Sequence, residues 1–203
     1  MTKLDVKKSG KALYSGRNGV WEEITVPPML YLTATGRGDP DGPAFAAATQ
    51  ALYAHAYPLK FAAKDAGRDH VVPPLEAQWW ADDPRAFTTA RRADWQWKAM
   101  LRLPVPVTEA MIAAARAKAA AKLGADAPDV SIEEIAEGLC LQCLHIGPYA
   151  DEAPVLAQLH DRIMPERGLT FGLPHHEIYL SDPRRTDPAK LRTILRQPVV
   201  PLT

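Results

Sequence analysis

The feature that most constrains the fold is one order of elements, strand-helix-strand-strand, which occurs twice along the chain. The second occurrence is the clearer one. Hydrophobic periodicity predicts strands at 138–146, 175–181 and 191–200 and a helix at 151–166. Gly147-Pro148 breaks the first strand, Gly168 ends the helix, and Asp182-Pro183 stops the second strand. A short helical turn is expected at 188–190, just before the last strand.

The first occurrence has the same order with a longer helix-to-strand connection. A strand is predicted at 29–35 and a helix at 44–57, where Pro58 kinks or ends the helix and "LKFAAK" can continue it. The segments "PLEAQWWADDP" and "DWQWKAMLRLPVP" then supply two strands. The punctuation matches as well, because "WWADDP" parallels "IYLSDP" and "AMLRLPV" parallels "TILRQPV". These two matches in register predict a duplication.

The two copies account for most of the chain. We expect an α+β fold made of duplicated β-α-β-β units, with an antiparallel sheet and helices on one of its faces. The 203 residues form one domain, 1–203, with a first unit at about 26–107 and a second at about 138–203. Between them, about 108–137, lies an Ala-rich helix that Thr108 caps and that runs to Leu123, followed by a connector. The first two dozen residues are expected to form an arm or an edge piece.

Composition excludes several classes of function. The 24 basic and 24 acidic side chains give a formal net charge of zero, which argues against a dedicated nucleic-acid binder. Neither an N-terminal apolar segment nor a long apolar run is present, so we expect a cytoplasmic protein without membrane contact. Cys140 and Cys143 lie three apart on a predicted strand and point to opposite faces, which favours two ordinary reduced cysteines. No spacing is typical of a metal or cofactor site.

Glu177 stands out because it lies inside a predicted strand, where an unpaired buried carboxylate is costly. Aligning Asp83-Pro84 with Asp182-Pro183 sets Gln78 opposite Glu177, Trp80 opposite Tyr179 and Glu76 opposite His175. Strand alternation then predicts that these side chains face away from the helices, while Trp79, Ile178 and Leu180 pack beneath them. Such a face is either a solvated sheet surface or part of a small-molecule pocket. Trp95 and Trp97, expected on a shared face of the next strand, favour the pocket.

These residues resemble a known family. The segments "LQCLHIGPYADEAPVLAQLHDRI", "HHEIYLSDPRRTDPAKLRTILRQPV", "PLEAQWWADDP" and "WQWK" are similar to the GyrI-like small-molecule-binding proteins, in their stand-alone form. The resemblance implies two β-α-β-β units of the SHS2 type with pseudo-twofold symmetry and a ligand cleft between them. Relatives serve as drug-sensing effector-binding domains of transcription factors. In many of them the acid of the motif corresponding to Glu177 is a pocket carboxylate, and the residue at Tyr179 lines the same pocket.

Some stand-alone relatives are hydrolases that open the cyclopropane of duocarmycin- and yatakemycin-type DNA-alkylating compounds, and the resemblance implies this activity here. Glu177 would activate the water, and Tyr179 or Tyr149 would donate to the oxygen that becomes a phenol. Trp80 and Trp97 would sandwich the flat ligand. The remaining predicted ligand contacts are Gln78, His175, the walls Tyr57 and Phe61, and the second acid Glu76. His145 is expected to be a hydrogen-bonded structural group.

Two alternatives stay open from the sequence. The chain can be a non-catalytic protein that sequesters drugs or senses a ligand, or it can be an interaction module that modulates gyrase, as the family name suggests. No segment is left over for a DNA-reading motif, which departs from the transcription-factor relatives. The expected partner is a hydrophobic and aromatic small molecule, and the chain can be a monomer or a homodimer.

Overall fold

The computed structural model describes residues 3–82 and 91–202, and these residues divide into two compact units. Unit 1 comprises Met1–Ser9 and Met29–Ile135, and unit 2 comprises Gly10–Pro28 and Ala136–Thr203. None of the helices in the described residues is long and apolar enough to cross a membrane.

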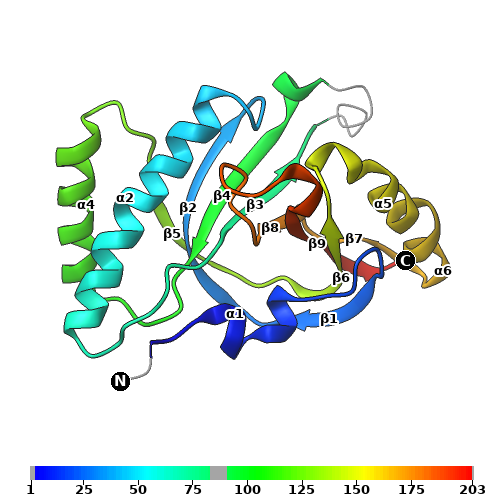
Figure 1. Ribbon diagram of the computed structural model, residues 1–203, viewed down its shortest axis with the longest axis horizontal. Coiled ribbons are helices and arrows are strands. Elements are labelled where there is room, and N and C mark those ends of the chain that lie inside the picture. The colour runs from blue at the N-terminus through cyan, green and yellow to red at the C-terminus, as the bar shows by residue number, and fades with distance from the viewer. Residues whose placement is uncertain (1–2, 83–90, 203) are drawn as a thin grey trace. The chain divides into compact units, whose positions relative to one another are not determined.

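Unit 1 contains an antiparallel sheet in the order β5-β2-β4-β3 (Figure 1). Its strands are β2 (Met29–Arg37), β3 (Leu75–Trp80), β4 (Gln96–Arg102) and β5 (Ser131–Ile135). Strand β5 was not predicted from the sequence, which placed its start in a connector. It pairs with β2 and forms one edge of the sheet.

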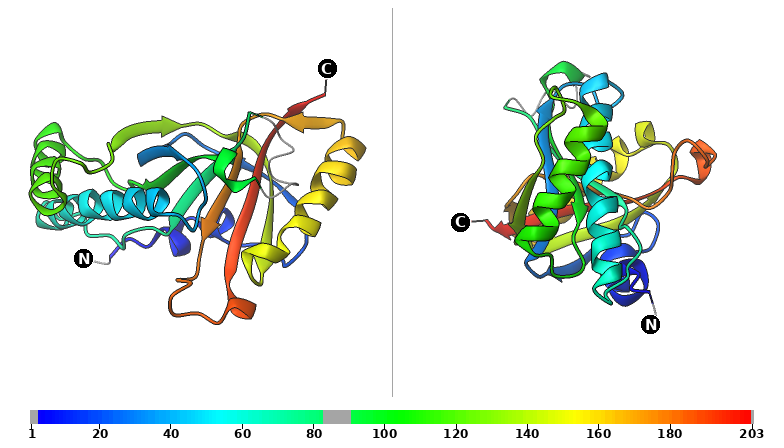
Figure 2. Two further views of the ribbon diagram at one scale, coloured as in Figure 1. Left: turned by 90° about the horizontal axis from the view of Figure 1, so that it is seen from above. Right: turned by 90° about the vertical axis from the view of Figure 1, so that its left-hand side faces the viewer.

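Two long helices belong to unit 1. Helix α2 (Pro43–Asp65) includes Pro58 and continues through "LKFAAK", so the proline does not end it. Helix α4 (Glu109–Leu123) begins where the Thr108 hydroxyl accepts a hydrogen bond of 3.3 Å from the amide of Met111, as the predicted cap requires. Figure 2 shows α4 lying alongside α2. Its alanines at 115 and 119 are buried, because small side chains allow two helices to approach closely.

Unit 2 contains an antiparallel sheet in the order β1-β6-β9-β8, with the short β7 paired to the far end of β9. The strands are β1 (Glu22–Val26), β6 (Gly138–Ile146), β7 (Leu169–Phe171), β8 (His175–Tyr179) and β9 (Arg192–Pro201). The N-terminal segment therefore supplies an edge strand, as expected. The short helix α1 (Val6–Ser9) belongs to unit 1, and a 3-10 turn at Lys11–Tyr14 precedes β1.

The helical segment of unit 2 changes its hydrogen-bonding pattern along its length. A 3-10 turn, Tyr149–Asp151, leads into α5 (Ala153–Gln158), a π-helical turn at Leu159–Ile163 and the final turn α6 (Met164–Glu166). Its apolar side packs on the sheet. Leu159 and Met164 form a core with five further buried residues, Trp21, Leu141, Cys143, Leu195 and Val199.

The predicted strand-helix-strand-strand series is present in both units, although unit 2 adds the unpredicted short strand β7 before β8, and the α+β class with an antiparallel sheet is confirmed. In each unit the last strand of the motif pairs between the other two. The predicted 3-10 turn at Pro188–Lys190 is present. The common origin of the two copies stays a prediction, and the Asp83-Pro84 stop on which their alignment rests lies outside the described residues.

Candidate functional site

Glu177 lies on the helix-covered face of its sheet. The register of β8 and β9 sets Glu177 directly across from Leu195, and directly opposite residues share a face. Leu195 belongs to the core that Leu159 and Met164 of the helical segment complete. The prediction that Glu177 faces away from the helix is therefore wrong, and with it the prediction that Ile178 packs beneath the helix.

Gln78, the residue of the first copy that the alignment matches to Glu177, lies on the face of its own sheet that is turned away from the helix. Trp79 pairs across from Trp97, and both rings contact Phe45 of α2, with centroid distances of 5.2 and 5.1 Å. Trp79 therefore packs beneath the helix, as predicted, and Gln78 must face away from it. Aligning the Asp-Pro stops thus pairs residues on opposite faces.

Glu177 and Tyr179 form the center of the site. The hydroxyl of Tyr179 donates a hydrogen bond of 2.8 Å to Oε2 of Glu177. The ring of Tyr179 is held edge-to-face by Tyr149, with 5.7 Å between ring centroids. Glu177 is half-buried, with 16% of its side chain exposed, whereas Tyr149 is exposed. The three predicted catalytic residues are thus brought together within unit 2, with a carboxylate set behind two aromatic rings.

A second acid, Glu152, lies deeper in the same place. It stands between the 3-10 turn and α5, and only 5% of it is exposed. Burial raises the pKa of Glu152 to about 9, and the negative charge of Glu177 adds to the shift, while the hydroxyl of Thr193 opposes it. Thr193 is fully buried and lies directly across from Tyr179. The site therefore holds two electrostatically coupled carboxyl groups.

The histidines near these acids are neutral or structural. Burial lowers the pKa of His175 to about 3, and His160 and His176 contribute to the shift. Nε2 of His175 lies 3.7 Å from Oε1 of Glu177, so a neutral imidazole borders the carboxylate. His145 makes a hydrogen bond of 3.1 Å to the carbonyl of Pro148, which confirms its predicted structural role at the turn before Tyr149.

Trp97 is a core residue of unit 1. It is 2% exposed, it packs on Phe45, and its ring lies where a side chain at Gly36 would have to go. Trp80 follows Trp79 on β3 and so faces the opposite side of the sheet from Trp97. The prediction that Trp80 and Trp97 sandwich one ligand is wrong, because the sheet lies between them. Trp80 stays a predicted ligand contact.

The other predicted contacts in unit 1 fall into two groups. Glu76 and Gln78 are buried on the face away from α2. Tyr57 and Phe61 are exposed and lie one helical turn apart on α2. Glu76 and Gln78 therefore lie on the side of the sheet opposite to α2. Unit 1 does not bring them together with Tyr57 and Phe61. Trp95 lies one residue before β4, and its ring contacts that of Trp79, the partner of Trp97 across the strands, with 5.9 Å between centroids, so it lies on the same side of the sheet as Trp97, as predicted.

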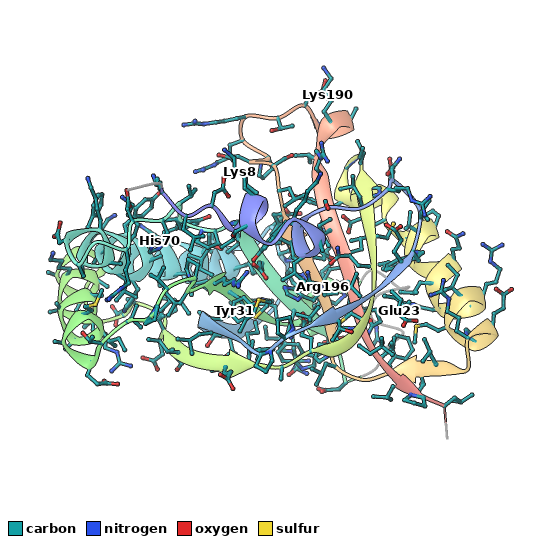
Figure 3. The ribbon with its side chains drawn as sticks, turned by 90° about the horizontal axis from the view of Figure 1, so that it is seen from below. Lys8, Glu23, Tyr31, His70, Lys190 and Arg196 are labelled. Atoms are coloured by element: carbon teal, nitrogen blue, oxygen red, sulfur yellow. The ribbon has the colours of Figure 1, made fainter. Side chains whose placement is uncertain are left out.

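A buried charge network lies on the other face of the unit 2 sheet. The carboxylate of Glu137 binds Nδ1 of His176 at 2.8 Å and Nη1 of Arg196 at 3.0 Å. Arg196, labelled in Figure 3, also donates to Gln142 and to the carbonyl of Leu13 in the N-terminal arm. These groups are almost fully buried, so the network ties the arm to the sheet through satisfied charges.

No group of three or more histidine, cysteine, aspartate or glutamate side chains among residues 3–82 and 91–202 is arranged to hold a metal ion. Cys140 and Cys143 are both free and buried, and burial raises the pKa values of their thiols to about 12 and about 11. The register places them on opposite faces of β6, as predicted.

Glu152 and Thr193 are the residues that the sequence did not reveal. An acid at the start of a helix is ordinary, because it complements the helix dipole, so Glu152 carried no special signal. Its spacing of three residues after Tyr149 was the only available hint. Thr193 became visible only through the pairing of β8 with β9.

Comparison with known proteins places this arrangement in a family. The sequence model of one protein family, the GyrI-like small molecule binding domain, matches residues 21–200. The chain therefore belongs to the GyrI-like family. Among curated proteins the comparison found no match.

Solved structures agree with this assignment. The chain is 39% identical to an uncharacterized conserved protein from Listeria innocua, with a TM-score of 0.88, covering 98% of this chain and 100% of that one. It is 38% identical to a hydrolase from the same organism, with a TM-score of 0.86 and the same coverage. The C-terminal domain of EcmrR, at 10% identity and a TM-score of 0.55 over 90% of this chain and 98% of that one, shares the fold.

Proposed function

We propose that this protein binds flat, hydrophobic aromatic molecules and hydrolyses the cyclopropane ring of duocarmycin- and yatakemycin-type genotoxins. The observation that carries the proposal is the contact between Tyr179 and Glu177, a half-buried carboxylate oriented by a hydroxyl and bordered by aromatic rings. The similarity to a hydrolase from Listeria innocua at 38% identity supports a catalytic role for the chain.

The reaction requires a base near a water molecule and a donor near an oxygen. Water attacks the least hindered ring carbon, the strained C–C bond breaks, and its electron pair passes into the dienone, whose oxygen becomes a phenolate. Glu177 takes the proton of the water. The hydroxyl of Tyr179 is already donated to Glu177, so Tyr179 positions the base and Tyr149 is the tyrosine that meets the phenolate oxygen.

The alternative is a protein that binds such ligands without turnover. The family description, a small-molecule-binding domain, favours this second candidate. Both proposals expect tryptophan or tyrosine fluorescence to change when a flat aromatic ligand is added, so binding alone does not separate them.

One assay separates the candidates. Purified protein is incubated with a duocarmycin-type compound, and the water adduct is measured by mass spectrometry. We expect turnover that Glu177→Gln abolishes and that Glu134→Gln, a change at an exposed glutamate of unit 1, leaves intact. Tight binding of the compound with no adduct would overturn the hydrolase and leave the binding protein.

A further inference from the structure

Glu152 is a buried acid, and one of its two carboxyl oxygens makes no hydrogen bond within the part of the chain that the structure describes. Its Oε1 atom is inaccessible to solvent and has no hydrogen-bond partner among the described residues. A buried polar atom in this state costs free energy unless a bound molecule or water satisfies it. Buried and unpartnered acids are uncommon in native proteins, so this one calls for a functional explanation.

The position of Glu152 links it to the proposed site. The hydroxyl of Thr193 interacts with the carboxyl of Glu152 and lowers its pKa. Thr193 pairs across from Tyr179, whose hydroxyl donates a hydrogen bond to Glu177. The two acids therefore flank one cross-strand pair on the helix-covered face. Their charges interact, which means that both cannot ionise readily at the same time.

We propose that Glu152 is the proton donor of this site, a neutral carboxylic acid that passes its proton to an oxygen of the bound molecule while Glu177 accepts one from water. The proposal deepens the proposed function and rests on it for the identity of the substrate. A carboxylic acid suits the step better than a tyrosine, because the product is itself a phenol. Transfer from Tyr149 would exchange one phenolate for another of similar basicity.

The proton balance closes within the pair. Glu177 gains a proton from the attacking water, and Glu152 loses one to the phenolate, so the substrate gains the elements of one water molecule. Passing a proton from Glu177 back to Glu152 restores the starting state. The direction of that return follows from burial, because the more buried Glu152 is the poorer place for a negative charge.

The pH dependence follows from the same environment. Other titratable groups lie on the elements packed around Glu152: Asp151 and Tyr149 on the 3-10 turn, His160 on the π-helical turn, His145 on β6, and His175, Glu177 and Tyr179 on β8. His175 is neutral over the working range. We therefore expect turnover to be lost as the pH rises through the pKa of Glu152, near 9.

The first arm of the test is kinetic. Glu152→Gln keeps the size of the side chain and removes the transferable proton, and we expect kcat to fall by roughly 10²-fold or more with little change in KM. The alkaline limb of the pH profile should move or disappear in this variant. Glu166→Gln, at an exposed position of the same helical segment, is the matched control. Turnover of Glu152→Gln at the wild-type rate would overturn the proposal.

The second arm needs no substrate and separates this proposal from the proposed function. Carbon-13 NMR of glutamate-labelled protein reports each carboxyl as the pH is changed. We expect one carboxyl, absent from Glu152→Gln, to stay neutral at pH 7 and to ionise at a lower pH in Glu177→Gln, because the neighbouring charge is gone. If no compound is turned over but this neutral carboxyl is found, the proposed hydrolase activity is refuted, while the assignment of Glu152 as a neutral acid is retained. If Glu152 titrates like an ordinary glutamate, the proposal fails whatever the substrate.

Discussion

The hydroxyl of Tyr179 hydrogen-bonds Oε2 of Glu177, two residues earlier on the same strand. Residues two apart on a strand share a face, so the backbone itself sets these side chains beside each other. The bond occupies one carboxylate oxygen, and Tyr149 packs against the tyrosine ring from the helical segment. Tyr179 thereby limits the orientations that Glu177 can take.

Tyr179→Phe tests this orientation. The ring and its packing on Tyr149 are retained, and only the hydrogen bond to a carboxylate is lost, which is worth about 1.5–3 kcal/mol. We expect turnover of a duocarmycin-type compound to fall by about tenfold or more, with the fold intact by circular dichroism. Tyr53→Phe is the control, because Tyr53 lies on α2 in unit 1, where its ring contacts Tyr57 and not the residues of this site. Unchanged kcat in Tyr179→Phe would show that the bond does not position the base.

The Glu137 carboxylate predicts a dependence of stability on acid pH. Burial opposes its ionisation, but the charges of His176 and Arg196 hold the pKa of Glu137 at about 2, below its ordinary value of 4.5. The unfolded chain therefore binds the proton first as the pH falls. The stabilisation is present above about pH 4.5 and is lost as the pH drops through about 2, an effect of roughly 3 kcal/mol.

Urea denaturation between pH 5 and pH 2 would measure this loss. Glu137→Gln should flatten the acid slope and lower stability at pH 5 by about 3 kcal/mol, because it leaves the charges of Arg196 and His176 buried. Glu134→Gln, at an exposed position, should change neither quantity. An acid slope equal to wild type in Glu137→Gln would assign the dependence to another group.

Gly36 is expected to tolerate no side chain. An added Cβ would overlap the ring of Trp97, which is closed in by Phe45 on another side. Gly36→Ala should lower the free energy of unfolding by about 1–3 kcal/mol, as overpacking does. Combining it with Trp97→Leu should give less than the sum of the two effects, and chemical denaturation of all three variants measures the difference. Additive effects would contradict the contact.

Trp97 and Trp80 should differ in how much each contributes to the stability of the fold. Trp97→Ala opens a cavity in a packed core, and we expect a loss of about 3–5 kcal/mol by chemical denaturation. Trp80 is only partly buried, on the other face, and Trp80→Ala should cost less. Equal destabilisation by the two substitutions would contradict the placement of Trp97 in the core and Trp80 outside it.

Much of the fold could be predicted because its signals are local. The apolar strands, the Thr108 cap and the Asp-Pro and Gly stops each depend on neighbouring residues, and the predicted strand-helix-strand-strand series is present in both units. Strand β5 was missed, because "SIEEI" has acids at two of its five positions and becomes a strand only by pairing with β2.

The sequence by itself determined the class of fold, the family and the alternation that sets Glu177 beside Tyr179. The tertiary structure decided which face those side chains occupy. A shift of one residue moves every side chain of a strand to the opposite face, and matching the Asp-Pro stops placed Glu177 on the wrong one. The pairing of β8 with β9 and the packing of the helical segment corrected the face and brought Glu152 to Glu177. Strand register and helix packing depend on contacts between residues far apart in the chain. A local sequence pattern therefore cannot predict them.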